Sequence, residues 1–215
     1  MIRVLFITLL LSGCVSTQNK PLTETNKNSL GKIGVVSSIG DTLQCNFTGL
    51  TVFTNEEQLY QLPRELNIQL TTSLTENLME LEHEAISLDR DVISYIKDTK
   101  GASKFSNIKL NKEKLNAESI DTVVIYDGDF HYKSTGGYYA RNNALNTLAS
   151  LYVYSVSSGE LMGSFYKPRT DLRRYFSCQT SSIDVGTTMY KLAEKAGIET
   201  QKELVNSVFS SVNSI

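Results

Sequence analysis

Leucines recur along residues 64–83 at intervals of three and four, and this spacing predicts an amphipathic helix. The positions are Leu66, Leu70, Leu74, Leu78 and Leu81. A second helical pattern, with two apolar stripes, runs from Asp184 to Val212, and Gly197 between the stripes predicts a kink or a break. The chain is therefore expected to contain one long helix in its first half and another at its C-terminus.

Apolar and β-branched runs elsewhere predict strands. Residues 33–39 are predicted to form a buried strand, which Gly40 and Asp41 either end or interrupt with a bulge. Residues 43–53 are predicted to contain its hairpin partner, and a loop is expected around residues 55–63. Residues 91–96 predict a helical turn, and the polar stretch 97–114 an exposed connection. The remaining expected strands are 85–88, 121–132, 144–156 and 161–166, the last two joined by a turn at 157–160.

Hairpins outnumber strand–helix–strand units in this order. The pattern therefore predicts an α+β fold with a mostly antiparallel sheet, one long amphipathic helix after the first hairpin and a C-terminal helix. A single domain is expected over residues 31–215, because a chain of this length can bury a core of its own.

The N-terminus carries a targeting signal. One basic residue, the apolar run 4–11 and small residues before Cys14 make a secretory signal peptide over residues 1–13, and the run is too short to span a bilayer. The order Leu11-Ser12-Gly13-Cys14 resembles the lipobox of bacterial lipoproteins, whose cysteine is acylated. Because Val15 follows the cysteine, the resemblance implies a bacterial outer-membrane lipoprotein that faces the periplasm. Residues 14–30 are then the lipidated cysteine and a flexible tether.

Composition narrows the function class. The chain has 21 basic and 23 acidic residues, 40% apolar residues and a formal charge of -2. These values exclude a disordered chain and a disulfide-dense miniprotein, and they argue against a nucleic-acid partner. Cys45 and Cys178 are disulfide candidates in an oxidising compartment, although two buried thiols that never meet would leave the same sequence. They predict no metal site, since no second ligand lies at short spacing.

The order of elements, with the turn Ser158-Gly159-Glu160-Leu161, resembles periplasmic lipoproteins of the curli-secretion and penicillin-binding-protein-activator types. The stretches 35–41 and 49–53 also look like a group of uncharacterised envelope proteins. Neither resemblance supplies catalytic residues, and no cofactor is expected.

Asp127, Asp129 and His131 alternate along one strand and should share a face. Two carboxylates and an imidazole could bind a metal or act as an acid/base pair. The alternative is a solvated strand face, with Tyr126, Phe130 and Tyr132 pointing inward. His83, near the end of the first long helix, is interpreted as structural, at a place where a cation suits the helix dipole.

Two segments are candidate interfaces. A basic stretch could grip an anionic partner, or be a solvated loop. A glycine turn carries two tyrosines that would anchor an interface if exposed and join the core if packed back on the sheet. The candidates are Lys167, Arg169, Arg173, Arg174 and Tyr175 in the first, and Gly136, Gly137, Tyr138 and Tyr139 in the second.

These observations favour a non-catalytic binding or accessory module for an envelope protein, anchored in the lipid bilayer through Cys14. The first alternative is a homo-oligomeric structural or secretion-associated envelope component. The second is an envelope enzyme that uses Asp127, Asp129 and His131.

Overall fold

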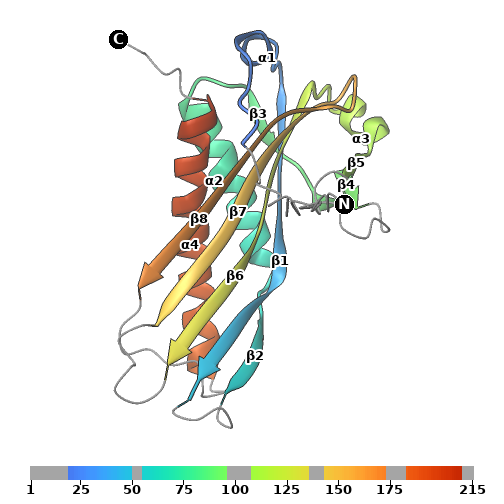
Figure 1. Cartoon of the computed structure of the whole chain (residues 1–215). Helices are drawn as coiled ribbons and strands as arrows, with labels where there is room; N and C mark the ends of the chain where they lie inside the picture. Colours follow the sequence, from blue (N-terminus) through green and yellow to red (C-terminus); the bar gives the residue numbers. More distant parts are fainter. Residues whose placement is uncertain (1–18, 50–54, 96–107, 136–142, 173–182, 210–215) are drawn as a thin grey trace, which may run out of the picture.

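A computed structural model of the chain describes residues 19–49, 55–95, 108–135, 143–172 and 183–209. Its centre is a twisted sheet of six strands (Figure 1). Five follow one another across the sheet in the order β2-β1-β6-β7-β8, and the short β3 pairs with the start of β1. The strands are β1 (Ile33–Thr48), β2 (Glu56–Gln61), β3 (Ala85–Ser87), β6 (Thr122–Thr135), β7 (Ala144–Ser155) and β8 (Leu161–Leu172).

The sheet is mostly antiparallel. β2 is antiparallel to β1, and β6, β7 and β8 form an antiparallel meander. β1 runs parallel to β6 and to β3. With a long helix after the first hairpin and another at the C-terminal end, the α+β fold predicted from the sequence is confirmed.

Two long helices, α2 (Arg64–Glu80) and α4 (Ile183–Phe209), cover one face of the sheet, and the short α1 (Glu24–Asn28) lies at one end (Figure 1). A smaller group of elements packs on part of the other face. It comprises the 3₁₀ turn η2 (Arg90–Val92), β4 (Ile93–Tyr95), β5 (Ile108–Leu110) and α3 (Lys112–Ala117). Strands whose two faces are both covered need apolar residues at consecutive positions, and Val123, Val124 and Ile125 are fully buried in β6.

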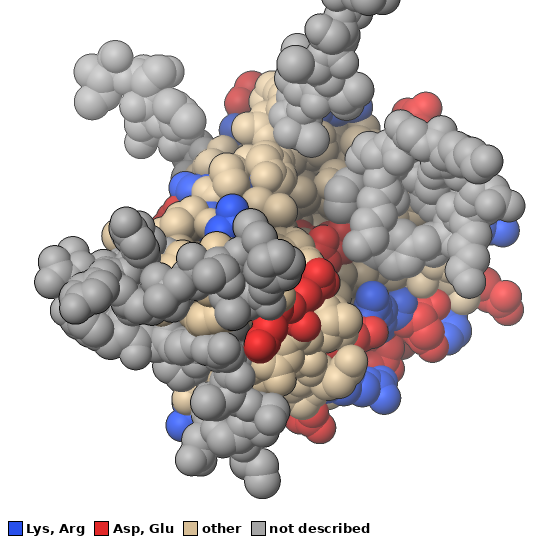
Figure 2. Space-filling model, turned by 60° about the horizontal axis from the view of Figure 1, so that its bottom comes forward, with Lys and Arg blue, Asp and Glu red and all other residues tan. Residues whose placement is uncertain are grey.

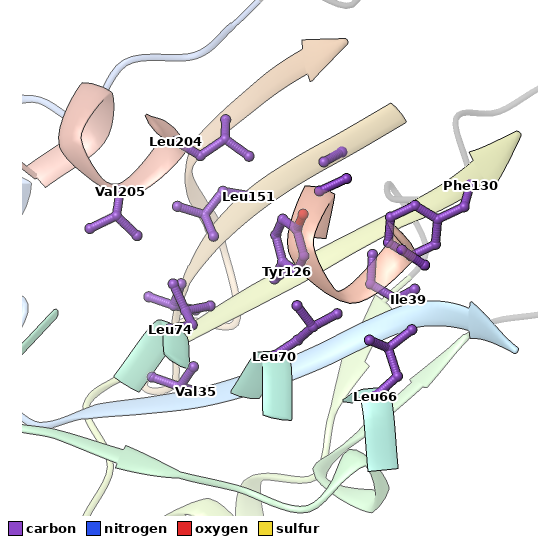
Figure 3. Packing of buried hydrophobic residues seen from close by; sticks show 14 of the residues in the cluster. Val35, Ile39, Leu66, Leu70, Leu74, Tyr126, Phe130, Leu151, Leu204 and Val205 are labelled. Atoms are coloured by element: carbon purple, nitrogen blue, oxygen red, sulfur yellow. The ribbon is translucent and has the colours of Figure 1, made fainter. Parts of the chain in front are cut away.

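The main core lies between the sheet and the two long helices. The leucines that recur along α2 point into it, and they meet Tyr126 and Phe130 of β6 and Leu204 and Val205 of α4 (Figure 3). Leu66, Leu70, Leu74 and Leu78 have no solvent-exposed surface. The spacing seen in the sequence is therefore the buried face of α2.

The first strand differs from expectation. Residues 33–48 form one continuous strand, so residues 43–48 are not the hairpin partner of 33–39. The register against β6 shifts between Ile39 and Leu43, so Gly40 and Asp41 form an irregularity inside the strand rather than a turn. The hairpin partner is β2, in residues where a loop was expected. Its alternating exposure, with no fully buried residue, explains the weak apolar signal.

The stretch 91–114 is also more regular than predicted. Of the helical turn expected at 91–96, only the start is helical, as part of η2, and β4, which pairs with β5, follows it. α3 begins inside the expected connection. These elements form a second apolar cluster with the sheet, which contains Leu110 and Leu115 together with Val123 and Ile125 of β6. Short strands with few apolar positions acquire their stability from this tertiary contact, which periodicity does not report.

Candidate functional site

A cleft of about 530 Å³ opens where the irregular part of β1 meets the start of α2. One wall is β1, the second is the first part of α2 as far as Thr72 together with Leu62 ahead of it, and the third runs from the end of β3 to the start of η2. The lining residues are Val36, Ser37, Asp41, Leu62, Arg64, Asn67, Ile68, Thr71, Thr72, Ser87, Leu88, Asp89 and Arg90.

The cleft exists because the outer edge of β1 has two different strand neighbours. β3 pairs with Ile33–Val35 and β2 with Thr42–Phe47, so residues 36–41 lie between them without a strand at that edge. An exposed strand edge offers unpaired N–H and C=O groups. Here two polar side chains of α2, Asn67 and Thr71, occupy that edge.

Asn67 takes the place of a strand residue. Its Oδ1 accepts a hydrogen bond from the Ile39 amide at 3.1 Å, and its Nδ2 donates to the Ile39 carbonyl at 3.3 Å. Asn67 Oδ1 also accepts from the Ser37 hydroxyl at 3.0 Å, and Thr71 Oγ1 accepts from the Ser37 amide at 2.9 Å. The polar floor of the cleft is therefore hydrogen-bonded and held in a fixed arrangement.

The rim of the cleft carries charge. Arg90 of η2 donates from Nη1 to Asp41 Oδ1 of β1 at 3.1 Å, and both side chains are largely exposed. Arg64, the first residue of α2, belongs to none of the ion pairs within the described part of the chain. It therefore presents an exposed cation at the mouth of the cleft.

An apolar side chain lies beside that cation. Ile68, one turn after Arg64 on α2, is 56% exposed although it is large and apolar. A guanidinium next to an exposed isoleucine suits a peptide segment that pairs an acidic side chain with an apolar one, since burial of the apolar side chain strengthens the ion pair beside it.

The sequence pattern was not interpreted as a site at the polar residues of the cleft, although their spacing along the helix could have indicated it. Asn67, Thr71 and Thr75 recur every four residues and form a polar row beside the leucine row of the same helix. Thr75 continues the pattern, because its Oγ1 lies 2.9 Å from Ser87 Oγ of β3. A polar row next to the buried face of a helix indicates contact with a strand edge.

Asp127, Asp129 and His131 do lie on one face of β6, but at different depths. Asp127 is 1% exposed, so the expected solvated face is wrong for that residue, whereas Asp129 and His131 are half-buried. His131 Nδ1 lies 3.0 Å from Gln44 Oε1 of β1. Within the described residues, no group of three or more His, Cys, Asp or Glu side chains could hold a metal ion. The expected inward position of Tyr126, Phe130 and Tyr132 is confirmed.

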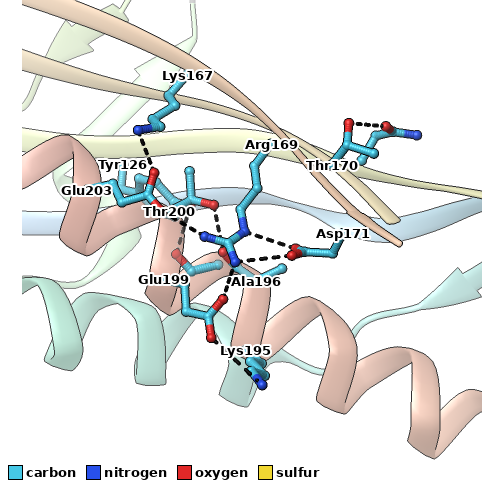
Figure 4. A network of polar contacts seen from close by, with 12 residues as sticks. Tyr126, Lys167, Arg169, Thr170, Asp171, Lys195, Ala196, Glu199, Thr200 and Glu203 are labelled. Carbon is cyan, nitrogen blue, oxygen red and sulfur yellow. Dashed lines mark hydrogen bonds and ion pairs between the residues drawn. The ribbon is translucent and has the colours of Figure 1, made fainter. Parts of the chain in front are cut away.

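Lys167 and Arg169 of the basic segment form ion pairs with other side chains of the same chain. Arg169 reaches from β8 to α4, where its Nη1 donates to Glu203 Oε1 at 2.8 Å and its Nη2 to Glu199 Oε2 (Figure 4). It also makes a two-point contact with Asp171 on its own strand, at 3.0 and 3.1 Å. Lys167 pairs with Glu203 as well. These two cations therefore fasten the edge strand to the C-terminal helix.

The surroundings of two side chains between the sheet and α4 shift their pKa values. The hydrogen bonds that Arg169 donates to the Asp171 carboxylate raise the pKa of the guanidinium above its usual value, because they favour its charged form. Nearby, burial raises the pKa of Tyr126, whose hydroxyl donates to the Gly197 carbonyl of α4 at 3.1 Å. Both contacts hold α4 on the sheet.

Several of the predicted site residues lie outside the described part of the chain. These are Cys14, Cys178, the turn Gly136, Gly137, Tyr138 and Tyr139, and Arg173, Arg174 and Tyr175 of the basic segment. Cys45 is fully buried in β1 and is disulfide-bonded. Its pairing with Cys178 stays a prediction.

Acidic and basic side chains are mixed on the surface. On the face shown in Figure 2, they lie side by side along one flank, and neither sign covers the visible described surface. Among the described helices, none is both long and apolar enough to cross a membrane.

A comparison with protein-family models and with curated proteins finds no match by sequence. Solved structures similar to this chain include the PelC dodecamer from Paraburkholderia phytofirmans, with 10% identity, coverage of 84% of this chain and 94% of that chain, and a TM-score of 0.40. Lipoprotein GNA1162 from Neisseria meningitidis has 11% identity, coverage of 77% and 97%, and a TM-score of 0.36. The LpoB C-terminal domain from Salmonella enterica has 10% identity, coverage of 67% and 85%, and a TM-score of 0.27. With TM-scores below 0.5, these similarities carry no inference on function.

Proposed function

We propose that this chain is a lipid-anchored, non-catalytic binding module of the bacterial envelope, held on the periplasmic face of the outer membrane through acylated Cys14. Its cleft binds a segment of an envelope protein that presents an acidic side chain next to an apolar one. The observation that carries the binding site is the pairing of the exposed Arg64 with the exposed Ile68 at the mouth of a cleft whose floor is already hydrogen-bonded.

Two features support a recruiting role. The lipobox-like order that ends at Cys14 supplies an anchor in the membrane. A protein confined to one membrane meets a partner of the same compartment at a raised effective concentration, so a modest cleft affinity suffices for binding. The polar floor adds specificity, since its fixed donors and acceptors favour one register of the bound segment.

Site-specific photo-cross-linking tests the cleft. A benzophenone amino acid is placed at position 68 or 79 of the full-length chain in its native host, and the cells are irradiated. The two positions are matched, because Ile68 and Met79 lie on the same helix with exposures of 56% and 58%, and only Ile68 lines the cleft. We expect a discrete hetero-adduct from position 68 and none from position 79.

A charge reversal makes the test specific. Arg64→Glu should abolish the adduct from position 68, and mass spectrometry should map the linked peptide of the partner next to an acidic residue. Equal adducts from both positions, an adduct that survives Arg64→Glu, or no adduct from position 68 would overturn the cleft assignment. A self-adduct from position 68 would favour the homo-oligomeric alternative instead.

The enzymatic alternative has its own test. If Asp127, Asp129 and His131 carry a reaction, the triple alanine variant should abolish function in cells while a circular-dichroism melt shows that it is still folded, and Arg64→Glu should leave function intact. The binding module predicts the reverse result.

A further inference from the structure

The first described residues are fastened to the outer edge of the sheet. Lys20 exchanges two backbone hydrogen bonds with Ser164 of β8, at 2.7 and 3.0 Å, and Asn19 Oδ1 accepts from the Tyr166 amide at 2.8 Å. The ammonium group of Lys20 also donates to the Leu161 carbonyl. We call Asn19 and Lys20 the N-terminal clamp.

The chain after the clamp is also packed on the domain. Leu22 is 6% exposed and lies against Gly163 of β8, and Leu30 is 2% exposed in the main core. Between them α1 is capped by Thr23, whose Oγ1 accepts from the Asn26 amide at 3.2 Å. Residues 19–30 thus differ from the flexible tether expected of this polar sequence, because Leu22 and Leu30 pack this segment onto the domain.

The clamp shortens the tether that separates Cys14 from the domain. Only Val15, Ser16, Thr17 and Gln18 lie between Cys14 and Asn19. Five residue steps reach at most about 18 Å when fully extended, and about 12 Å as a coil. The longer strands of the sheet, such as β6 with 14 residues, are about 45 Å long, so this tether is much shorter than the domain.

We infer that the edge of the sheet formed by β8 and the N-terminal clamp faces the lipid bilayer, while the cleft at the opposite edge is presented to the periplasm. β8 and β2 are the two outermost strands of the sheet, and the cleft adjoins the end of the sheet that carries β2. The clamp occupies the free edge of β8 at Ser164, so that edge is also closed to strand addition at this point. The inference rests on the proposed acylation of Cys14.

Energy transfer to the membrane surface tests the orientation. The full-length lipidated protein is reconstituted in phosphatidylethanolamine–phosphatidylglycerol vesicles that contain a headgroup-labelled acceptor lipid. A donor fluorophore is attached through an unnatural amino acid at position 160 or 59. Glu160 is exposed next to Leu161 near the clamp, whereas Leu59 is 58% exposed on β2 at the opposite edge. We expect at least twofold higher transfer efficiency from position 160 than from position 59.

Two variants isolate the tether and the clamp. Ten Gly/Ser residues inserted between Ser16 and Thr17 should lower the transfer from position 160 and bring it toward that from position 59. Lys20→Pro, which removes the amide that donates to Ser164, should act in the same direction. A circular-dichroism melt confirms that each variant is folded.

The outcomes separate this inference from the proposed anchor. Vesicle flotation of the protein with equal transfer from both positions, or transfer unchanged by the ten-residue insertion, overturns the orientation and leaves the anchor standing. Failure of the wild-type protein to float, with Cys14→Ser behaving identically, overturns the anchor and the orientation together.

Discussion

At the scale of single residues, His83 shows how burial competes with the helix dipole. It lies just beyond the end of α2, where its amide donates to the Leu78 carbonyl at 3.2 Å, and the dipole there favours a cation. Its ring packs edge-on against Phe209 of α4, with 5.4 Å between ring centres. Desolvation by this burial lowers the pKa of His83 below its ordinary value of 6.5. Burial thus outweighs the favourable dipole that the sequence position suggested.

A pH dependence of stability follows. Below pH 6.5 the unfolded chain takes up a proton at His83 more readily than the folded protein does, so the free energy of unfolding falls as the pH falls through this range. Above pH 6.5 the contribution is fully present. His83→Phe keeps an aromatic ring against Phe209 and cannot titrate.

Urea unfolding from pH 5 to pH 8 measures the difference between wild type and His83→Phe. The wild-type protein should lose more stability than the variant on acidification, and the two should run parallel above pH 7. Parallel curves across the whole range would contradict a lowered pKa.

At the scale of elements, Gly197 explains how α4 crosses α2. The sequence suggested a kink or a break there, but α4 is one continuous helix through this residue. A Cβ on Gly197 would lie 2.9 Å from Leu70 Cδ2 of α2 and 3.4 Å from the Phe130 ring. The glycine therefore permits the close approach of two helices and a strand, and its carbonyl accepts the hydrogen bond from Tyr126.

Two glycines of the same helix provide a matched test of this role. Gly186 has no neighbour within 4 Å of a built Cβ, so Gly186→Ala should raise the free energy of unfolding by about 0.5 kcal/mol through helix propensity alone. Gly197→Ala gains the same propensity but crowds the fully buried Leu70, and should lower the free energy of unfolding by about 1 kcal/mol.

Urea denaturation of the two variants tests whether glycine is required at position 197 for close packing. Stabilisation by both substitutions would mean that the helices can move apart at no cost. The predicted opposite signs would identify close packing as the reason for glycine at this position.

At the scale of the whole molecule, Cys45 lies deep in the sheet, between β2 and β6 on β1. It is disulfide-bonded, and we propose Cys178, just before α4 in the chain, as its partner. Such a bond would close a loop that contains most of the domain, which restricts the unfolded chain. It would also be stable in an oxidising compartment, such as the periplasm in which we propose that the protein resides.

The covalent link predicts a large effect on stability. By the chain-entropy estimate, loss of the bond lowers the free energy of unfolding by roughly 4–5 kcal/mol. Guanidinium unfolding with and without dithiothreitol should show a large shift for the wild-type protein and none for Cys45→Ala/Cys178→Ala. A wild-type curve that does not respond to the reductant would exclude the bond.

Much of the fold can be predicted from the sequence, because the local spacing of apolar residues indicates directly which side chains are buried. The leucine row predicted α2 and its buried face, and the apolar runs predicted β6, β7 and β8 with the glycine turn at Gly159, whose φ is +77°. The alternation at Tyr126, Phe130 and Tyr132 identified the inner face of β6. In each case one element carries the whole signal, so no distant partner is needed to interpret it.

The remaining features depend on contacts between residues far apart in the chain. β1 continues through Gly40 and Asp41 because β6 pairs with it on both sides of the irregularity, and the cleft forms because β2 and β3 leave a gap at the same edge. Lys167 and Arg169 look like a free basic patch until α4 brings Glu199 and Glu203 to them. Local pattern indicates which residues are buried, whereas only the tertiary structure decides which partners satisfy the polar groups and charges that it brings together.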